Sequence, residues 1–306
     1  MRSDSLMALI TLLRPNQWLK NLILFAAIVF TGKLFDPGLF QLTLIGFLIF
    51  CAISSASYIF NDIIDVKYDR LHPDKKNRPL AAGIIKLSTA TELAFILVLV
   101  GLIAALFLSI EFFLITFAFT FLHIMYSLVL KKYAILDILS ISFSFSLRAL
   151  AGEMLTGYHL PIWLLLSIFF ASLFIASTKR HSEYIRQGAT TRPTLFQYRE
   201  HLLDFYTSTF ATASILSYAL FTFLEEPPLF SGPFKEFLID VFPQAIERKW
   251  LIITIPFIVF GMMRYAQLIY EGKEGEKPEK LITTDKPLII AILIWAIFVV
   301  TLLYII

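Results

Sequence analysis

Long runs of apolar residues, separated by short charged stretches, are the feature that most restricts the fold of this chain. Residues 39–60 contain no charged side chain, and several other runs approach or exceed the roughly 20 residues that cross a bilayer as a helix. Of the 306 residues, 58% are hydrophobic and only 16% are charged. The sequence therefore predicts an all-α, polytopic membrane protein that is surrounded by membrane lipids, with no nucleic-acid partner.

The spacing of these runs predicts nine membrane-spanning helices in a single integral-membrane domain, residues 1–306. The expected spans are 18–35, 39–60, 88–108, 111–130, 134–156, 161–178, 206–224, 250–270 and 287–306, with boundaries good to about two to four residues. An odd number of spans places the two termini on opposite sides of the membrane. The sequence leaves the oligomeric state open.

The distribution of lysine and arginine predicts the orientation, because cytoplasmic loops of membrane proteins retain these residues. With a cytoplasmic N-terminus, the opposite side holds only Lys33, Lys235, Arg248 and Lys249, and Arg148 and Arg264 fall within spans. The other 20 of the 26 lysines and arginines are then cytoplasmic. The two longest connecting segments, 61–87 and 179–205, lie on this same face of the inner (plasma) membrane. We expect them to meet over one cytoplasmic active-site mouth.

Four side chains with metal-ligand oxygens gather where the second span ends. On a helix, Asn61, Asp65 and Asp69 fall on one face at successive spacings of about 6 Å, and Asp62 points elsewhere. Such oxygens suit Mg²⁺, which substrate phosphates commonly complete. The alternative is a helix end with solvated carboxylates. Because polar groups at a membrane boundary are costly and tend to be functional, the pattern favours a metal site, with Asp62 as a weaker candidate.

Cationic and aromatic side chains accompany this cluster along the sequence. Lys75 and Arg78 could hold phosphate oxygens, or the loop lysines could contact lipid headgroups. Tyr58, one turn before Asn61, is either an interfacial anchor or a hydrogen-bonding partner of the substrate. Lys20, near the start of the first span, is a further candidate for binding an anion.

Arg148 lies within the fifth predicted span. An embedded arginine costs several kcal/mol unless it is paired or hydrated, so its helix face should line the bundle interior or a wet cavity. Asp137 and Ser144 share that face, but Asp137 is about three turns from Arg148 and could not touch it along one helix. The pattern favours an anion ligand over a structural interaction with Asp137.

A second polar cluster closes the sixth span, at Lys179, Arg180 and Glu183. Lys179 and Glu183 are four residues apart and could form an exposed helix pair worth a few tenths of a kcal/mol. Because this cluster would face Asn61–Asp69 across the same mouth, Glu183 is equally a candidate for a second metal carboxylate. The histidines show no ligand spacing, and we interpret them as incidental.

These motifs together resemble the UbiA-type superfamily of intramembrane prenyltransferases, whose Asn-Asp-x-x-Asp-x-x-x-Asp motif follows the second of nine helices. Within the superfamily, the chain is most similar to the branch that transfers phosphoribosyl groups to polyprenyl phosphates. The matching stretches run through nearly the whole chain: 14–21, 61–69, 72–83, 126–131, 148–152, 179–183, 264–265 and 285–288. Aromatic prenyltransferases carry a second Asp-rich motif where this chain has Lys179-Arg180-x-x-Glu183.

The resemblance implies a UbiA-like bundle and a Mg²⁺-dependent pentosyltransferase. A long polyprenyl phosphate, such as decaprenyl phosphate, would attack C1 of 5-phosphoribosyl 1-diphosphate and release diphosphate, giving a lipid-linked precursor for the cell envelope. Its matching positions, with the residue chemistry above, suggest metal binding by Asn61, Asp65 and Asp69; donor binding by Lys20, Tyr58, Lys75, Arg78, Lys131, Arg148 and Lys179; acceptor-phosphate binding by Lys131 and Arg148; and catalysis by Asp65, Lys131 and Arg148. Asp62, Arg180 and Glu183 are weaker candidates.

Two other functions remain open for such a chain. One is a UbiA-type enzyme that moves a prenyl group from a prenyl diphosphate to an aromatic or other small acceptor. The other is a transporter of an anionic lipid, which would not need a metal-chelating cluster at one mouth. A donor with a separate 5-phosphate and an acceptor phosphate require additional cations. Lys179-Arg180 in place of a second acidic motif therefore favours phosphoribosyl transfer.

Overall fold

The computed structural model describes residues 2–71, 75–187, 198, 200–225, 249–271, 281 and 283–305. Within these ranges the chain is helical with short connections and contains no strand, which confirms the predicted all-α class. The principal helices are α1 (Arg2–Leu13), α2 (Ala26–Phe30), α3 (Pro37–Asp69), α4 (Leu87–Leu108), α5 (Ile110–Leu128), α6 (Ala134–Thr156), α7 (Ile162–Gln187), α8 (Glu200–Leu224), α10 (Ile255–Tyr270) and α12 (Lys286–Val300). Short 3₁₀ turns flank them: η1 (Pro15–Phe25), η2 (Lys75–Asn77), η3 (Leu130–Lys132) and η7 (Trp250–Thr254); a π-helical segment, η8 (Thr301–Ile305), follows α12.

Eight helical segments in the described ranges are long and apolar enough to cross a membrane, and they match the second to ninth predicted spans. They are Pro37–Asp69, Leu87–Leu108, Ile110–Lys132, Ala134–Thr156, Ile162–Ile185, Glu200–Leu224, Trp250–Tyr270 and Lys286–Tyr304. Lys235 and Arg248, which count toward the predicted orientation, lie outside the described residues.

The first predicted span, 18–35, differs from the expectation because it is not one long α-helix. Its residues form the 3₁₀ segment η1 and the short helix α2. Arg14, which precedes η1, has a left-handed backbone (φ 54°), and Pro15 follows it at the start of the segment. Polar side chains of η1 also turn inward: Trp18 donates to Ser55 Oγ at 2.9 Å, and Asn21 is fully buried. These contacts hold η1 against α3 and α6.

Local sequence signals set the ends of the long helices. Asp36 caps α3, because its carboxylate accepts from the backbone N–H groups of Gly38 and Leu39, at 2.9 and 3.0 Å, and Pro37 stands at the first helical position. Ser109 caps α5 in the same way, accepting from the N–H of Phe112 at 3.0 Å. At the other end, α6 stops at Gly157, whose φ of 74° suits glycine.

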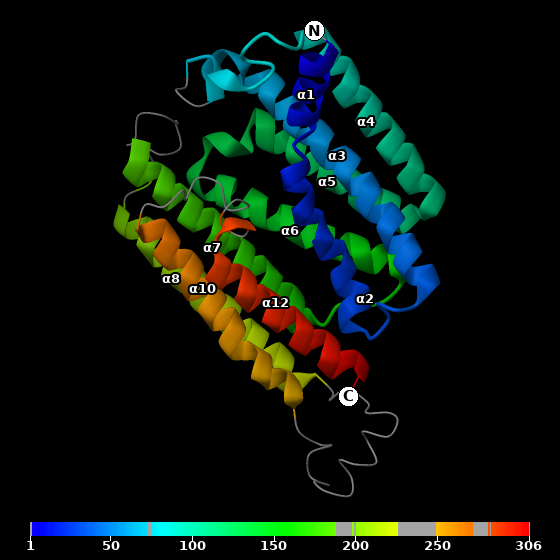
Figure 1. Cartoon of the computed structure of the whole chain (residues 1–306), viewed down its shortest axis with the longest axis vertical. Helices are drawn as coiled ribbons and strands as arrows, with labels where there is room; N and C mark the ends of the chain where they lie inside the picture. Colours follow the sequence, from blue (N-terminus) through cyan, green and yellow to red (C-terminus); the bar gives the residue numbers. More distant parts are fainter. Residues whose placement is uncertain are drawn as a thin grey trace, which may run out of the picture. The chain divides into compact units, whose positions relative to one another are not determined.

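The chain divides into two compact units, each described here by itself. The first contains Met1–Ile28 and Lys33–Tyr158, and the second contains Val29–Gly32 and His159–Ile306. In the first unit, η1 and helices α3–α6 enclose a core that includes Leu24, Phe50 and Phe119, and α1 packs on α3 (Figure 1). The rings of Phe50 and Phe119 lie 5.0 Å apart. A single domain over residues 1–306 stays a prediction.

In the second unit, α7 packs along α8, and α10 contacts α7, α8 and α12 (Figure 1). Phe174, Tyr265, Leu268 and Leu288 belong to its core.

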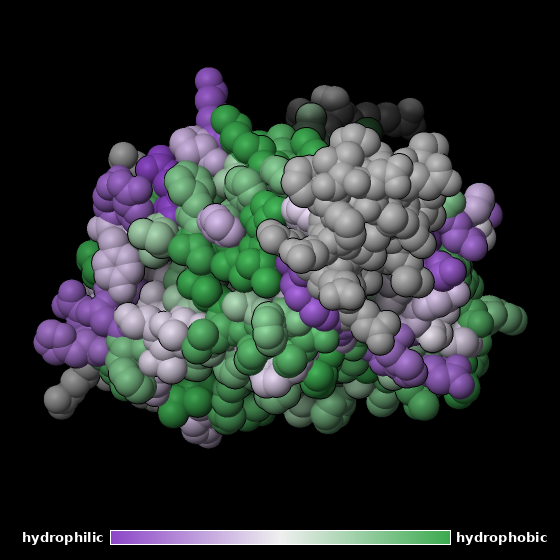
Figure 2. Space-filling view, turned by 90° about the horizontal axis from the view of Figure 1, so that it is seen from below, coloured by the Kyte–Doolittle hydropathy of each residue, from purple (hydrophilic) through white to green (hydrophobic). Residues whose placement is uncertain are grey.

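Large apolar side chains are also exposed on the helices. On α4, for example, Phe95, Val100 and Phe107 point outward. Figure 2 shows hydrophobic residues covering much of the face in view. A water-soluble protein rarely exposes apolar surface on this scale, whereas lipid tails accept it, so the surface agrees with a membrane setting.

Candidate active site

The last two turns of α3 carry the Asn61–Asp69 cluster beyond the apolar part of the helix. With 33 residues, α3 is about 50 Å long, well over the roughly 30 Å of the hydrocarbon core. The uncharged stretch ends at Phe60, and the helix continues without a break to Asp69. This confirms the predicted helical continuation. It presents the cluster at the membrane boundary.

Asn61 and Asp65 form the first half of the cluster, and both contact Lys131 from η3. The ammonium of Lys131 donates to Asp65 Oδ1 at 2.6 Å and to Asn61 Oδ1 at 3.0 Å. Asn61 Nδ2 in turn donates to the other carboxylate oxygen of Asp65, at 3.1 Å. The structure thus joins three residues that the sequence assigned to the site, although 66 positions separate Asp65 from Lys131.

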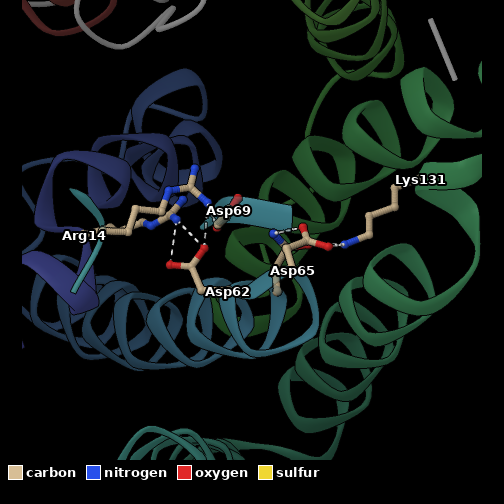
Figure 3. Close-up of polar contacts among 7 residues, drawn as sticks. Arg14, Asp62, Asp65, Asp69 and Lys131 are labelled. Atoms are coloured by element: carbon tan, nitrogen blue, oxygen red, sulfur yellow. Dashed lines mark hydrogen bonds and ion pairs between the residues drawn. The ribbon is translucent and has the colours of Figure 1, made fainter. Parts of the chain in front are cut away.

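Asp62 and Asp69 form the second half, and arginines hold both of them. Arg78 Nη1 donates to Asp62 Oδ1 at 3.0 Å and to Asp69 Oδ2 at 2.7 Å. Arg14 Nη2 reaches both oxygens of Asp62, at 2.6 and 2.7 Å. In Figure 3, Arg14 and Lys131 approach the aspartates from opposite sides.

The structure corrects the predicted grouping, which set Asn61, Asp65 and Asp69 together and Asp62 apart. Each step of four residues turns a helix by about 40° beyond a full circle, so Asp69 lies about 80° from Asn61 but only about 20° from Asp62. Asp62 and Asp69 consequently share Arg78, whereas Asn61 and Asp65 share Lys131.

Burial separates the two halves of the cluster electrostatically. The side chain of Asp62 is 3% exposed and that of Asp65 is 27% exposed. Asp69 is buried at the end of α3, nine residues past the apolar run. Its carboxylate is paired with the Arg78 guanidinium. Asp65 is thus the most accessible of the three carboxylates, Asp62, Asp65 and Asp69.

Sequence reasoning did not assign a site role to Arg14. The signal available was an arginine before a proline at the predicted cytoplasmic interface, but a single sequence does not show that it reaches Asp62, 48 positions away. Its guanidinium carbon also lies 5.3 Å from the ring centre of Tyr58. Tyr58 itself donates to Gln17 Oε1 at 3.2 Å, so both residues tie the start of the chain to α3.

Arg148 lies deeper in the same unit, on α6, and is 2% exposed. Its Nε donates to Asn21 Oδ1 at 2.8 Å, and its Nη1 donates to the backbone oxygen and Oγ of Ser144, at 3.0 and 2.6 Å. Asp137, the alternative partner, accepts instead from the hydroxyl of Tyr126 at 2.9 Å. In the part of the chain that the structure describes, Arg148 contacts no carboxylate.

The remaining predicted residues fall in different places. Lys20 is half-buried in η1 and Lys75 is exposed in η2, both in the first unit. Lys179, Arg180 and Glu183 lie on α7 in the second unit. Glu183 forms an ion pair with the buried Arg180.

His181, interpreted above as incidental, lies in a polar contact of the second unit. Its Nε2 is 3.1 Å from Asp204 Oδ1, which also accepts from the hydroxyl of Tyr270 at 2.7 Å. The contact joins α7, α8 and α10, so a structural role explains it.

Asn61 and Asp65 offer the donor chemistry that a hard divalent cation requires. Asn61 Oδ1 and Asp65 Oδ1 both accept from the Lys131 ammonium, so an amide oxygen and a carboxylate oxygen already point toward one cationic group. In the described residues, however, no group of three or more His, Cys, Asp or Glu side chains converges on one point. The set therefore fits a metal that takes few protein ligands and completes its shell with water and substrate oxygens, as Mg²⁺ does.

Residues 22–234 match the model of the UbiA prenyltransferase family, and this match covers more than half of the chain. The chain belongs to the UbiA prenyltransferase family. Among curated UbiA-like relatives, it is 34% identical to decaprenyl-phosphate phosphoribosyltransferase of Mycolicibacterium smegmatis, over 94% of this chain and 89% of the relative. It is 33% identical to the protein of the same name from Corynebacterium glutamicum, over 97% and 87%.

Solved structures of this family share the fold. A UbiA homologue from Archaeoglobus fulgidus, bound to GPP and Mg²⁺, superposes with a TM-score of 0.69 at 19% identity, covering 97% of this chain and 99% of that one. The same homologue bound to DMAPP and Mg²⁺ gives a TM-score of 0.67. These likenesses confirm the expected UbiA-type helical architecture.

Proposed function

We propose that this protein transfers a 5-phosphoribosyl group from 5-phosphoribosyl 1-diphosphate to a long-chain polyprenyl phosphate. The observation that carries the proposal is similarity over nearly the full length of the chain to two proteins named for this activity. Arg148 supports it, because this buried cation has only uncharged partners in the described chain and its charge is available to a phosphate group.

The chemistry requires little proton transfer. A phosphate oxygen of the acceptor attacks C1 of the ribose, the bond from C1 to the diphosphate breaks, and diphosphate leaves. A phosphate monoester has a second pKa of about 6, so the acceptor is already mostly dianionic at neutral pH and needs no general base. The protein's task is then to position two anions that repel each other and to neutralise the charge of the leaving group.

We assign Asn61 and Asp65 as metal ligands. Asp69 contributes less directly, since Arg78 already holds it. Mg²⁺, when bound, supplies charge neutralisation to the departing diphosphate. The Mg²⁺ bound in the Archaeoglobus structures supports this choice of metal. Asp62 is an anchor for two arginines and is not proposed as a ligand.

Lys131 and Arg148 are the proposed phosphate-binding residues shared by donor and acceptor. Lys131 is next to the proposed metal ligands, and Arg148 has only uncharged partners in the described chain. Lys20, Tyr58, Lys75 and Arg78 complete the proposed donor site of the first unit. Donor binding by Lys179, on α7 of the second unit, stays a prediction from the sequence. Arg180 and Glu183 are assigned to each other as an ion pair.

We propose that the site opens on the cytoplasmic side of the cell's inner (plasma) membrane, where a water-soluble phosphoribosyl donor would be available. Lysine and arginine are concentrated on one predicted face of the chain, and the face with this excess is normally the cytoplasmic one. The product would serve as a lipid-linked pentose precursor of the cell envelope.

The decisive assay incubates the purified protein in lipid nanodiscs with ribose-labelled phosphoribosyl diphosphate, decaprenyl phosphate and MgCl₂. We expect a labelled, lipid-soluble product that EDTA abolishes and added Mg²⁺ restores. A parallel reaction offers a labelled prenyl diphosphate with an aromatic acceptor. Product only in that reaction would replace the proposal with aromatic prenyl transfer. No lipid-linked ribose, together with protein-dependent movement of decaprenyl phosphate across vesicles, would instead indicate a transporter.

A further inference from the structure

The partners of Arg148 are unusual for a buried cation. Its guanidinium is held by an amide oxygen, a hydroxyl and a backbone carbonyl, and it lies 4.6 Å from the ring centre of Phe119 and 5.4 Å from that of Phe145. Each of these groups attracts a cation without cancelling its charge. Burying a charge without a counter-ion is unfavourable, so this arrangement calls for an explanation in the function of the site.

Asn21 holds the Nε edge of this guanidinium. The side chain is 0% exposed, and its Oδ1 accepts from Arg148 Nε at 2.8 Å and from Ser54 Oγ at 3.2 Å. Its Nδ2 donates to Cys51 Sγ at 3.4 Å. Because both neighbours of Oδ1 are donors, the amide has one favourable orientation, with its oxygen toward Arg148.

Ser144 is a second uncharged side chain that contacts Arg148 directly. Its Oγ accepts from Arg148 Nη1 at 2.6 Å and lies 2.9 Å from His123 Nε2. Either atom can donate in the contact between Ser144 and His123, depending on the imidazole tautomer. The two side chains that hydrogen-bond directly to Arg148, Asn21 and Ser144, are both uncharged.

We propose that Asn21 is a positioning residue that orients Arg148 through a neutral acceptor and leaves its positive charge available to a substrate phosphate. An aspartate of nearly the same size would make the same hydrogen bond, and it would pair with Arg148 more strongly. It would also neutralise the charge that an incoming anion requires. The inference rests on the proposed function for the identity of the anion, but the arrangement of uncharged partners around Arg148 stands without it.

The test is the Asn21→Asp variant of the full chain in nanodiscs, with binding as the primary measurement. The probes are inorganic pyrophosphate with MgCl₂ and a short polyprenyl phosphate, each titrated without the second substrate. We expect the unfolding temperature to be unchanged or higher, because an ion pair replaces a neutral hydrogen bond. We expect the Kd for at least one probe to rise by at least about tenfold, as an uncompensated carboxylate now competes with the phosphate.

Two further variants separate positioning from a purely structural role. Ser54→Ala removes the other donor to Asn21 Oδ1 without touching Arg148, and it should leave both Kd values within about twofold. Asn21→Ser stays neutral but is too short to hold Arg148 firmly. It should lower the unfolding temperature and the kcat for phosphoribosyl transfer while raising the Kd less than aspartate does. If Asn21→Asp does not fold, Asn21→Ser carries the test, and unchanged kcat and Kd would overturn the inference.

The two proposals fail in different ways. If wild-type protein binds a probe but makes no lipid-linked ribose, the proposed function is wrong, and the Asn21→Asp titration still decides the inference. The inference is overturned if Asn21→Asp binds both probes as tightly as wild type, or if wild type binds neither. In either case the neutrality of Asn21 does not make the charge of Arg148 available to a phosphate. If Asn21→Ser raises the Kd as much as Asn21→Asp, loss of fit explains the effect and the inference is overturned.

Discussion

At the scale of single residues, the four polar side chains at the end of α3 divide into two kinds of task. Asp65 is partly exposed and faces Lys131, whereas Asp62 is buried between Arg14 and Arg78. Both are aspartates in one motif, three positions apart. Their surroundings, not their residue type, distinguish a partly accessible carboxylate from one that anchors two arginines.

Asp65→Asn should abolish most activity while leaving the protein folded. An amide oxygen is a weaker ligand than a carboxylate, and loss of several kcal/mol of charge stabilisation corresponds to at least about a 100-fold drop in kcat. The measurement is phosphoribosyl transfer against MgCl₂ concentration, with thermal unfolding as the check on folding. Glu92→Gln, on an exposed face of α4, is the matched control for removing one carboxylate. Wild-type Mg²⁺ dependence in Asp65→Asn would contradict the assignment.

Asp62→Asn should act on stability. The change takes a carboxylate from between two arginines, and breaking hydrogen bonds between charged groups at a buried position costs about 1 to 3 kcal/mol. Arg14 and Arg78 are each partly exposed, so water would relieve some of this cost and the lower half of the range is expected. Thermal unfolding in detergent measures it. An unfolding temperature equal to that of Asp65→Asn would show that Asp62 has no special anchoring role.

At the scale of elements, the irregular η1 segment determines how the inner site is assembled. It carries Asn21 to Arg148, and its backbone passes directly over α6 at Gly152. A Cβ atom built at Gly152 would lie 2.0 Å from the backbone oxygen of Leu24 and 2.8 Å from its carbonyl carbon. Backbone atoms cannot rotate away as a side chain can, so only glycine allows this approach.

Gly152→Ala should therefore force η1 away from α6. Overpacking of this kind costs about 1 to 3 kcal/mol, and it should also lower affinity for phosphate probes because Asn21 and Arg148 sit on the two displaced elements. Gly261→Ala on α10 is the control, since the nearest atom to its Cβ, Leu288 Cδ1, is 3.9 Å away. Unfolding temperature and pyrophosphate affinity are the two readouts. Equal behaviour of the two variants would contradict the close-packing argument.

At the scale of the whole molecule, the sequence makes a prediction about orientation that chemical labelling can check. Cys51 is the only cysteine and is 3% exposed, so the wild-type chain should react little with a maleimide. Lys76→Cys and Lys33→Cys each place one exposed thiol on a predicted face. A membrane-impermeant maleimide should label Lys33→Cys in intact cells and Lys76→Cys only after permeabilisation. The reverse pattern would place the candidate site outside the cytoplasm.

Much of the architecture was predictable because hydrocarbon imposes a simple rule on the chain. A backbone in lipid must satisfy its own hydrogen bonds, so apolar runs of sufficient length become helices, and eight of the nine expected spans are long helices in the described structure. The exception is η1, whose Trp18 and Asn21 side chains make polar tertiary contacts, and hydropathy carries no information about such contacts. The placement of Asp65 at the end of a long helix was likewise predictable from the sequence, whereas its role as a metal ligand stays a prediction.

The sequence alone determined the membrane setting, the helical class and the inventory of charged groups, because each follows from composition and spacing along the chain. Only the tertiary structure decided which charges meet. Asp62 and Asp69 share Arg78, Lys131 reaches Asn61 and Asp65, and Arg148 is held by the neutral Asn21, 127 positions away. Hydrogen bonds and ion pairs form only between groups that lie a few ångströms apart in space, so the pairing of charges depends on how the helices pack and not on their order in the chain.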